Sequence, residues 1–269
     1  MTVGMKWIPD DVDPEVPSVA RVYDYLLGGG HNFAADRQFA EQLVAMLPGT
    51  RQIATMGRAF LRRVVLFLNS AGVHQFLDIG SGIPTVGNVH ELAQQADPEA
   101  RVVYVDIDPV AVAHSRLILE GDPRTVAIEA DLTDPCSVLG HPDARRVLDF
   151  SQPIGLLLLG VLNFLPDDRD PNRLLAQYRD ALAPGSYIAM SNVTADIRPD
   201  EIHAALELMK KGGNQFYPRT REQFTSFFDG LELVKPGVVT FPRWRPDSQT
   251  DLTDGPERDQ VFAGVGRKP

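Results

Sequence analysis

The chain has 269 residues, 43% of them hydrophobic and 23% charged, which is typical of a globular protein with a sizeable core. Its formal net charge of −10 counts against non-specific nucleic-acid binding, because such binding needs lysine and arginine to neutralise phosphates. The single cysteine, Cys136, excludes an internal disulfide and a multi-cysteine zinc site, and the histidines lack the spacing of metal ligands. We therefore expect neither a bound metal ion nor a nucleic-acid partner.

The longest uncharged apolar stretch, Ile154 to Leu165, has twelve residues, whereas a membrane-spanning helix needs about 20. Residues 1–13 lack a basic start followed by an apolar run, so no secretory signal is expected. The sequence predicts a cytoplasmic protein that does not bind a membrane.

The first part of the chain contains no convincing strand pattern. It predicts helices over residues 18–27, 36–46 and 52–71, which are interrupted by Gly28-Gly29-Gly30 and by Pro48-Gly49. We therefore predict that residues 1–72 form a helical cap on the remainder of the protein, residues 73–269.

That remainder alternates between short apolar runs and helical patterns. The runs are rich in Val, Ile and Leu without alternation, which is typical of a parallel sheet covered on both faces. The predicted strands cover residues 75–79, 102–107, 126–130, 154–159 and 187–191. The predicted helices between them cover residues 86–96, 109–119 and 171–182, each with a proline near its start. This order predicts an α/β fold with a doubly wound, mostly parallel sheet.

Three later runs, residues 231–234, 238–241 and 261–265, read as strands near the C-terminus. They have no helical pattern between them, so we expect an antiparallel strand pair there.

The stretch "FLDIGSGIPT", residues 76–85, places two glycines directly after the first predicted strand. Ligands of open α/β sheets bind beyond the carboxyl ends of the strands. Gly80 and Gly82 permit backbone conformations closed to other residues and let a ligand approach the main chain. A lone G-x-G is more often an ordinary tight turn, here with Pro84 opening the next helix. Whether this turn binds a ligand therefore has to be inferred from the residues around it.

Two carboxylates at the ends of the next two strands favour a ligand site. Asp106 ends the second predicted strand, 24 residues after Gly82, where an acidic residue can bind both hydroxyls of a ribose. Asp131 follows the third, where it can accept a hydrogen bond from the exocyclic amine of an adenine.

The residues of the turn itself argue against a dinucleotide. Asp78 lies two residues before Gly80, and a carboxylate there disfavours pyrophosphate and favours a cation. Thr85 stands where a dinucleotide motif has its third glycine, and no G-x-x-x-x-G-K-[ST] loop occurs. Adenine, ribose and a positively charged amino-acid tail together describe S-adenosylmethionine.

Several stretches of the chain resemble the actinobacterial family of S-adenosylmethionine-dependent methyltransferases, many of whose members are named only as proteins of unknown function. They are "PSVARVYDYLLGGGHNFAADR", "RAFLRRVV", "QFLDIGSGIPTVGNVHE", "VVYVDIDPVAVAHSR" and "PRWRPD". The resemblance runs from about Pro17 to the C-terminus. It implies a class I methyltransferase fold with a Rossmann-like sheet of seven strands, and it does not imply a substrate.

The resemblance implies that S-adenosylmethionine binds at Asp78, Gly80, Gly82, Asp106 and Asp131. We expect the neighbours of these residues to complete the cofactor site: Ser81, Ile107, Leu132 and Gly160. In related carboxyl-directed methyltransferases an arginine before the first strand pairs with the cofactor's carboxylate. Arg58 occupies a similar place and is assigned that role, with a surface arginine as the alternative.

Three residues are candidates for a role in methyl transfer. Asn163, after the fourth predicted strand, can position an acceptor or cap the local turn. Tyr23 and His31 flank the triple glycine, which is either a mobile segment over the cofactor or a helix cap with an ordinary loop. His31 is a candidate base, although a loop histidine is more often solvated.

We therefore predict a methyltransferase that acts on a small molecule. The alternatives are a non-catalytic module that binds S-adenosylmethionine or S-adenosylhomocysteine, an NAD(P)-dependent oxidoreductase, and a methyltransferase for protein or nucleic acid. The absence of an evident base gives the first alternative weight. Asp78 and Thr85 count against the second, and the acidic composition counts against the third.

Overall fold

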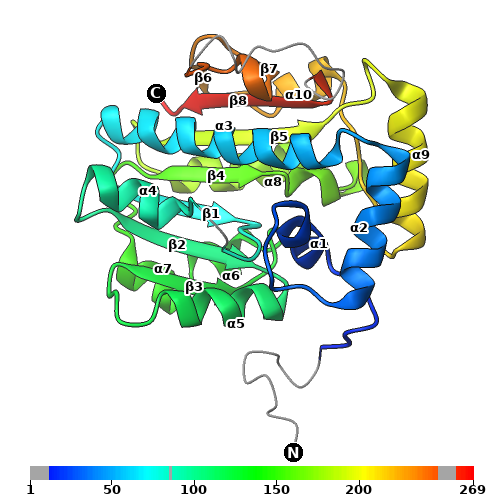
Figure 1. Ribbon diagram of the computed structural model, residues 1–269. Coiled ribbons are helices and arrows are strands. Elements are labelled where there is room, and N and C mark those ends of the chain that lie inside the picture. The colour runs from blue at the N-terminus through cyan, green and yellow to red at the C-terminus, as the bar shows by residue number, and fades with distance from the viewer. Residues whose placement is uncertain (1–11, 85–86, 248–258) are drawn as a thin grey trace, which may run out of the picture.

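The computed structural model describes residues 12–84, 87–247 and 259–269, which form one twisted sheet with helices on both faces (Figure 1). The eight strands lie in the order β3-β2-β1-β4-β5-β8-β6, and β7 also pairs with β8. The parallel strands are β1 (Gln75–Ile79), β2 (Arg101–Asp106), β3 (Thr125–Glu129), β4 (Gly155–Leu159) and β5 (Tyr187–Val193). The antiparallel strands are β6 (Glu232–Leu233), β7 (Val239–Thr240) and β8 (Val261–Arg267).

The doubly wound fold expected from the sequence is confirmed. The sheet has seven positions along its width, because the short strands β6 and β7 pair with β8 at different points along its length. The chain turns from β1 to β2 on one side and to β4 on the other, so the strand order reverses at β1. The carboxyl end of β1 is where ligands of such sheets bind.

Each face of the sheet is covered by its own helices. On one face lie α3 (Thr50–Ser70), α4 (Val89–Ala96) and α5 (Pro109–Ile118), and on the other α6 (Pro135–Leu139), α7 (Pro142–Val147), α8 (Pro171–Ala181) and α10 (Arg221–Ser226). Phe76 and Leu157 point to the first face and Leu77 and Leu156 to the second. Successive residues of one strand therefore belong to the hydrophobic cores on opposite faces of the sheet, which explains the unbroken apolar runs.

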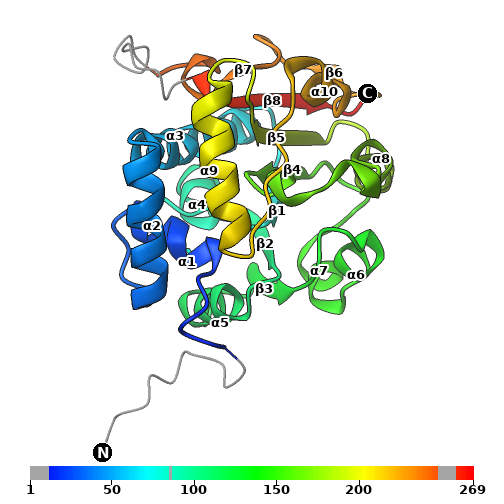
Figure 2. The same ribbon diagram turned by 90° about the vertical axis from the view of Figure 1, so that its right-hand side faces the viewer.

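Three helices lie across the carboxyl ends of the strands: α1 (Val19–Leu26), α2 (Ala34–Met46) and α9 (Pro199–Lys211) (Figures 1 and 2). They share a small apolar cluster that includes Val22, Phe39, Leu43 and Met209. We call these three helices the cap.

The cap differs from the prediction in its membership. The helix predicted over residues 52–71 is α3, and it packs on the sheet, where Phe60, Val64 and Leu68 are fully buried. In its place the cap contains α9, for which we predicted no helix. Residues 1–72, which we predicted to form the cap, therefore contain two helices of the cap, α1 and α2, and one helix of the core, α3.

The helix after β1 also begins later than predicted. Its N-cap is Asn88, with a reciprocal capping box between Asn88 and Glu91, so Pro84 does not open it. Thr85 and Val86 lie outside the described residues. Among the residues that the structure describes, no helix is both long and apolar enough to cross a membrane.

Candidate functional site

A cavity of about 810 Å³ lies between the carboxyl ends of the parallel strands and the cap. Its volume falls within the usual range of ligand sites, roughly 300–1,000 Å³. Its lining includes every residue that the sequence predicted for the cofactor site: Arg58, Asp78, Gly80, Ser81, Gly82, Asp106, Ile107, Asp131, Leu132 and Gly160. The topology therefore brings together residues that are scattered over a hundred positions of the chain.

The glycine turn after β1 is tightly bonded to β2. Gly80 and Ser81 donate their backbone N–H groups to the carbonyl of Val105, at 2.8 and 3.1 Å, and Gly82 donates to Oδ2 of Asp106 at 2.6 Å. Gly80 has φ +73° and Gly82 has φ +65°. A Cβ on Gly80 would come within 2.5 Å of Val161, so this position requires glycine both for its conformation and for space.

Asp106 ties the glycine turn to the start of α5. Its Oδ1 accepts a hydrogen bond from the backbone N–H of Asp108 at 2.9 Å, while Oδ2 accepts from Gly82. Burial raises the pKa of Asp106, and the backbone hydrogen bonds oppose that rise. Each carboxylate oxygen has a second lone pair, so the group can still accept hydrogen bonds from two ligand hydroxyls.

Asp78, at the end of β1, is a buried acid in a cavity wall, with 7% of its surface exposed. Burial raises the pKa of Asp78 to about 7; the Arg58 guanidinium works against this rise and the Asp106 carboxylate adds to it. A cation placed beside Asp78 would stabilise its charged form.

Arg58 projects from α3 into the same end of the cavity. Its Nη2 donates a hydrogen bond to the carbonyl of Gly87 at 2.7 Å. Together with Asp78 it gives this end one positive and one negative side chain, which matches the ammonium and carboxylate of an amino acid.

The other end of the strand edge is more open. Asp131 is exposed at the end of β3, and its Oδ1 accepts from the backbone N–H of Thr133 at 2.7 Å. Ile107, directly after Asp106, is 65% exposed although it is a large apolar side chain. With Leu132 it forms an apolar wall on which a flat base can pack.

Asn163 lines the cavity beyond β4 and holds two strand ends together. Its Nδ2 donates to the carbonyl of Gly160 at 2.9 Å, and its Oδ1 accepts from the backbone N–H of Val193 at 2.7 Å. Ser191 accepts from the N–H of Gly160 at 2.9 Å. These hydrogen bonds correspond to the alternative that the sequence left open, in which Asn163 caps the local turn.

The two other candidates for methyl transfer are placed differently. Tyr23 lines the cavity, but its hydroxyl donates to the carbonyl of Ala54 at 3.1 Å, and burial raises its pKa. His31 is not part of the lining; its ring packs edge-on against His114 with centroids 3.7 Å apart. The structure does not bring His31 to the cavity.

Two of the three glycines are required by the local structure at the end of α1. Gly28 ends α1 with φ +83°, and Gly29 donates its N–H to the carbonyl of Asp24 at 2.9 Å. A Cβ on Gly29 would collide with the Asp24 carboxylate. The segment is not part of the cavity lining, so its placement agrees with the helix cap and not with a segment over the cofactor.

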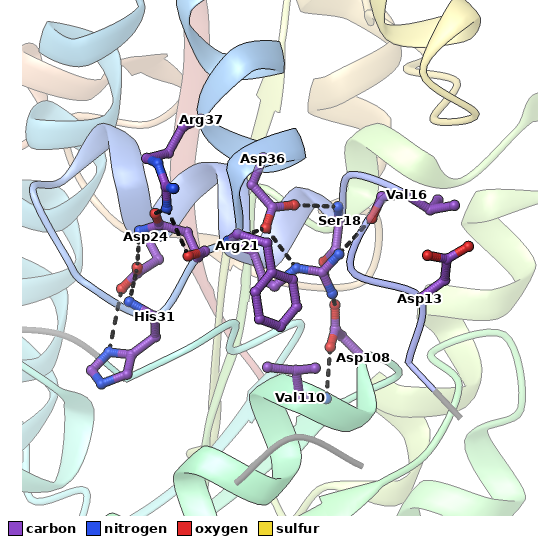
Figure 3. A network of polar contacts seen from close by, with 12 residues as sticks. Asp13, Val16, Ser18, Arg21, Asp24, His31, Asp36, Arg37, Asp108 and Val110 are labelled. Atoms are coloured by element: carbon purple, nitrogen blue, oxygen red, sulfur yellow. Dashed lines mark hydrogen bonds and ion pairs between the residues drawn. The ribbon is translucent and has the colours of Figure 1, made fainter. Parts of the chain in front are cut away.

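Our prediction missed a polar network that joins the cap to this strand edge (Figure 3). Arg21 on α1 bonds Oδ2 of Asp36 through Nε at 2.8 Å and lies 3.9 Å from Oδ2 of Asp108. The Ser18 hydroxyl also bonds Oδ2 of Asp108, whose Oδ1 caps α5 through Val110 at 2.8 Å. The pattern Asp108-Pro109 does indicate a helix N-cap in the sequence, whereas the contact with Arg21 depends on tertiary structure.

Solved structures resemble the chain over nearly its whole length. A candidate methyltransferase from Thermobifida fusca YX is 43% identical, with a TM-score of 0.92 over 98% of this chain and 99% of that one. A DUF574 family protein from Streptomyces avermitilis MA-4680 is 36% identical, with a TM-score of 0.91 over 96% and 99%. The N-methyltransferase NodS from Bradyrhizobium japonicum WM9 is 13% identical, with a TM-score of 0.50 over 82% and 99%, and shares the fold alone.

No curated protein matches the chain. Residues 5–269 match the protein family described as S-adenosyl methyltransferase. The match covers the cap, the strand-end carboxylates and the C-terminal strands alike. The chain therefore belongs to the S-adenosyl methyltransferase family.

Proposed function

We propose that this protein transfers a methyl group from S-adenosylmethionine, bound across the ends of β1, β2 and β3, to a small molecule held under the cap. The observation that carries the proposal is that Asp78, Asp106 and Asp131, from three successive strands, line one cavity together with the glycine turn. S-adenosylmethionine supplies a methyl group activated by a positively charged sulfur.

Each part of the cofactor has a matching group in the cavity. Asp106 accepts the ribose hydroxyls with the lone pairs left free by Gly82 and Asp108. Asp131 accepts the adenine amine, and Ile107 and Leu132 pack on the base.

The amino-acid end of the cofactor meets the charged pair at β1. Asp78 faces the ammonium group, and Arg58 faces the carboxylate, for which a guanidinium is well suited. Gly160, where a Cβ would meet nothing within 4 Å, leaves open space in the cavity beside the proposed position of the sulfur.

The turn is poorly suited to a pyrophosphate. Phosphates at a glycine turn need bare backbone N–H groups, but those of Gly80, Ser81 and Gly82 are bonded to Val105 and Asp106. The Asp78 carboxylate would also repel a phosphate once it is ionised. These observations support S-adenosylmethionine over a nicotinamide dinucleotide.

A second candidate function is binding of S-adenosylmethionine or S-adenosylhomocysteine without catalysis. It is favoured by the placement of Asn163 and Tyr23, whose polar groups bond to the backbone, and of His31, which is not part of the cavity lining. Methyl transfer needs alignment of donor and acceptor, and it needs a base only where the acceptor must first lose a proton.

The test is turnover with methyl-labelled S-adenosylmethionine and a small-molecule extract of an actinobacterium. We expect label to appear in an extract compound, with one S-adenosylhomocysteine released for each methyl transferred. Tight binding of S-adenosylhomocysteine without any transfer from fractionated extracts would instead support the non-catalytic function.

A further inference from the structure

The cavity has two chemically different halves. Its charged lining residues are Arg58 and the carboxylates at the ends of β1, β2 and β3: Asp78, Asp106, Asp108 and Asp131. The half formed by α2, α9 and the first turns of α3 has no charged residue in the described lining. Its walls are mainly apolar: Leu43, Leu47, Ile53, Ile202, Leu206 and Met209.

Helix α9 gives this second half its apolar wall. Ile202, Leu206 and Met209 recur at helical spacing, and Ile202 and Met209 are buried. The charged residues of the helix, among them Glu201, Glu207 and Lys210, are exposed to solvent on its other sides.

The wall is held in place from both sides. Met209 packs with Val22 and Phe39 of the other cap helices. Gly212, just after α9, lies so close to the Phe39 ring that a Cβ would come within 2.4 Å of it. Phe164 and Phe216 also line the cavity, as an edge-to-face pair with ring centroids 4.6 Å apart. We call this half of the cavity, bounded by α2, α9 and the first turns of α3, the chamber.

The chamber and the strand-edge half are parts of one cavity. Since the proposed function places the cofactor in the strand-edge half, the chamber is the part of the cavity left for the acceptor. A charged acceptor would lose its hydration there without an opposite charge to pair with, and this costs several kcal/mol. An apolar acceptor gains about 25 cal/mol for each Å² removed from water.

We propose that the methyl acceptor is an uncharged, mainly apolar small molecule, enclosed in the chamber between α2, α3 and α9. This inference rests on the proposed function, because it takes the strand-edge half as the cofactor's place. Thr50 and Asn214 also line the chamber, and their polar groups can hydrogen-bond to one or two uncharged polar groups on the acceptor.

The test compares two probes of the same ring, neutral 1-naphthol and anionic 1-naphthoate, titrated at pH 7 into protein saturated with S-adenosylhomocysteine. We expect 1-naphthol to bind at least tenfold more tightly. Equal binding of the two probes, tighter binding of 1-naphthoate, or no binding of 1-naphthol overturns the inference.

A matched pair of variants on α9 locates the probe. Ala205 lines the chamber, whereas its neighbour Ala204 is exposed and is not part of the lining. Ala205→Glu should weaken 1-naphthol binding at least tenfold and leave S-adenosylhomocysteine binding within twofold, while Ala204→Glu changes neither. A 1-naphthol affinity that is equal in both variants contradicts the placement.

Failure of the proposed function and failure of the inference about the acceptor give different binding results. Wild-type protein that does not bind S-adenosylhomocysteine refutes the proposed function. Protein that binds it but does not prefer the neutral probe refutes only the nature of the acceptor. The preference is measured on the wild type, so it holds as a test even if Ala205→Glu does not fold.

Discussion

Replacing Arg21 by methionine tests whether the network between cap and core is a buried, stabilising interaction. The Arg21 side chain is 4% exposed and that of Asp36 is fully buried, with 2.8 Å between Nε and Oδ2. Arg21 also donates to the carbonyl of Val16 at 2.6 Å. The substitution keeps an unbranched apolar side chain in place of the arginine's aliphatic part but leaves the Asp36 carboxylate buried without its counter-charge.

Removing one partner of a buried ion pair costs about 3–5 kcal/mol. The backbone N–H groups of Ser18 and Phe33 still donate to Asp36, at 2.9 and 2.7 Å, so we expect the lower end, about 3 kcal/mol. For a chain of this size the corresponding drop in Tm is roughly 6–12 °C, at about 2–4 °C for each kcal/mol.

The assay is urea unfolding followed by circular dichroism, with Arg62→Met as the control. Arg62 pairs with Asp247 at 2.7 Å, but both side chains are more than half exposed, 51% and 56%, so that its loss should cost less than about 1 kcal/mol. In the double variant Arg21→Met/Asp36→Asn, part of the lost stability should return, since the carboxylate no longer carries a charge. If Arg21→Met costs no more than Arg62→Met, the network is not the buried interaction described here.

Three further predictions concern the cavity. Because the pKa of Asp78 is about 7, its carboxyl is neutral at lower pH and ceases to attract an ammonium; calorimetric affinity for S-adenosylhomocysteine should therefore rise with pH through about 7, and Asp78→Asn should flatten the profile. Gly80→Ala should lower the free energy of unfolding more than Gly82→Ala, because both positions have positive φ but only Gly80 faces Val161; equal losses would contradict the close contact. Asn163→Ala should destabilise the protein by about 1–3 kcal/mol in urea, since it leaves the part-buried backbone N–H of Val193 without its acceptor, and an unchanged midpoint would argue against its structural role.

The strand edge was predictable because its signals are local. Buried parallel strands are continuous apolar runs, and an aspartate at or just after the carboxyl end of such a strand, as Asp78, Asp106 and Asp131 are, lies at a common edge of the sheet. The glycines between them carry their own conformational signal, which the positive φ values of Gly80 and Gly82 confirm.

The cap was harder to predict than the strand edge, because the helices that form it are distant from one another in the sequence. Residues 199–211 do carry helix signals, with Pro199 at the start, acidic residues in the first turn and Lys210 and Lys211 in the last. Nevertheless, we predicted no element between the strand over residues 187–191 and the run at residues 231–234. That α9 packs on α2 while α3 packs on the sheet follows from which apolar faces meet, and one sequence does not determine this.

The roles of single polar residues depend on the same tertiary contacts. Asn163, Tyr23 and His31 have residue types suited to catalysis, and nothing in their local sequence shows that Asn163 bonds the ends of two strands or that His31 packs on His114. Asp108 was not among the predicted site residues, and its bond to Ser18, the residue before α1, depends on tertiary structure.

The most direct test of the account is calorimetric titration of S-adenosylhomocysteine and, separately, of NAD⁺ into the wild type and Asp106→Ala. Loss of a hydrogen bond to a charged group costs about 1.5–3 kcal/mol, so we predict that S-adenosylhomocysteine binds the wild type and binds the variant roughly 10- to 150-fold more weakly. NAD⁺ should bind neither. Tight binding of NAD⁺, or an affinity for S-adenosylhomocysteine that does not change in Asp106→Ala, would contradict the claim that the strand-end carboxylates hold an adenosine sulfonium.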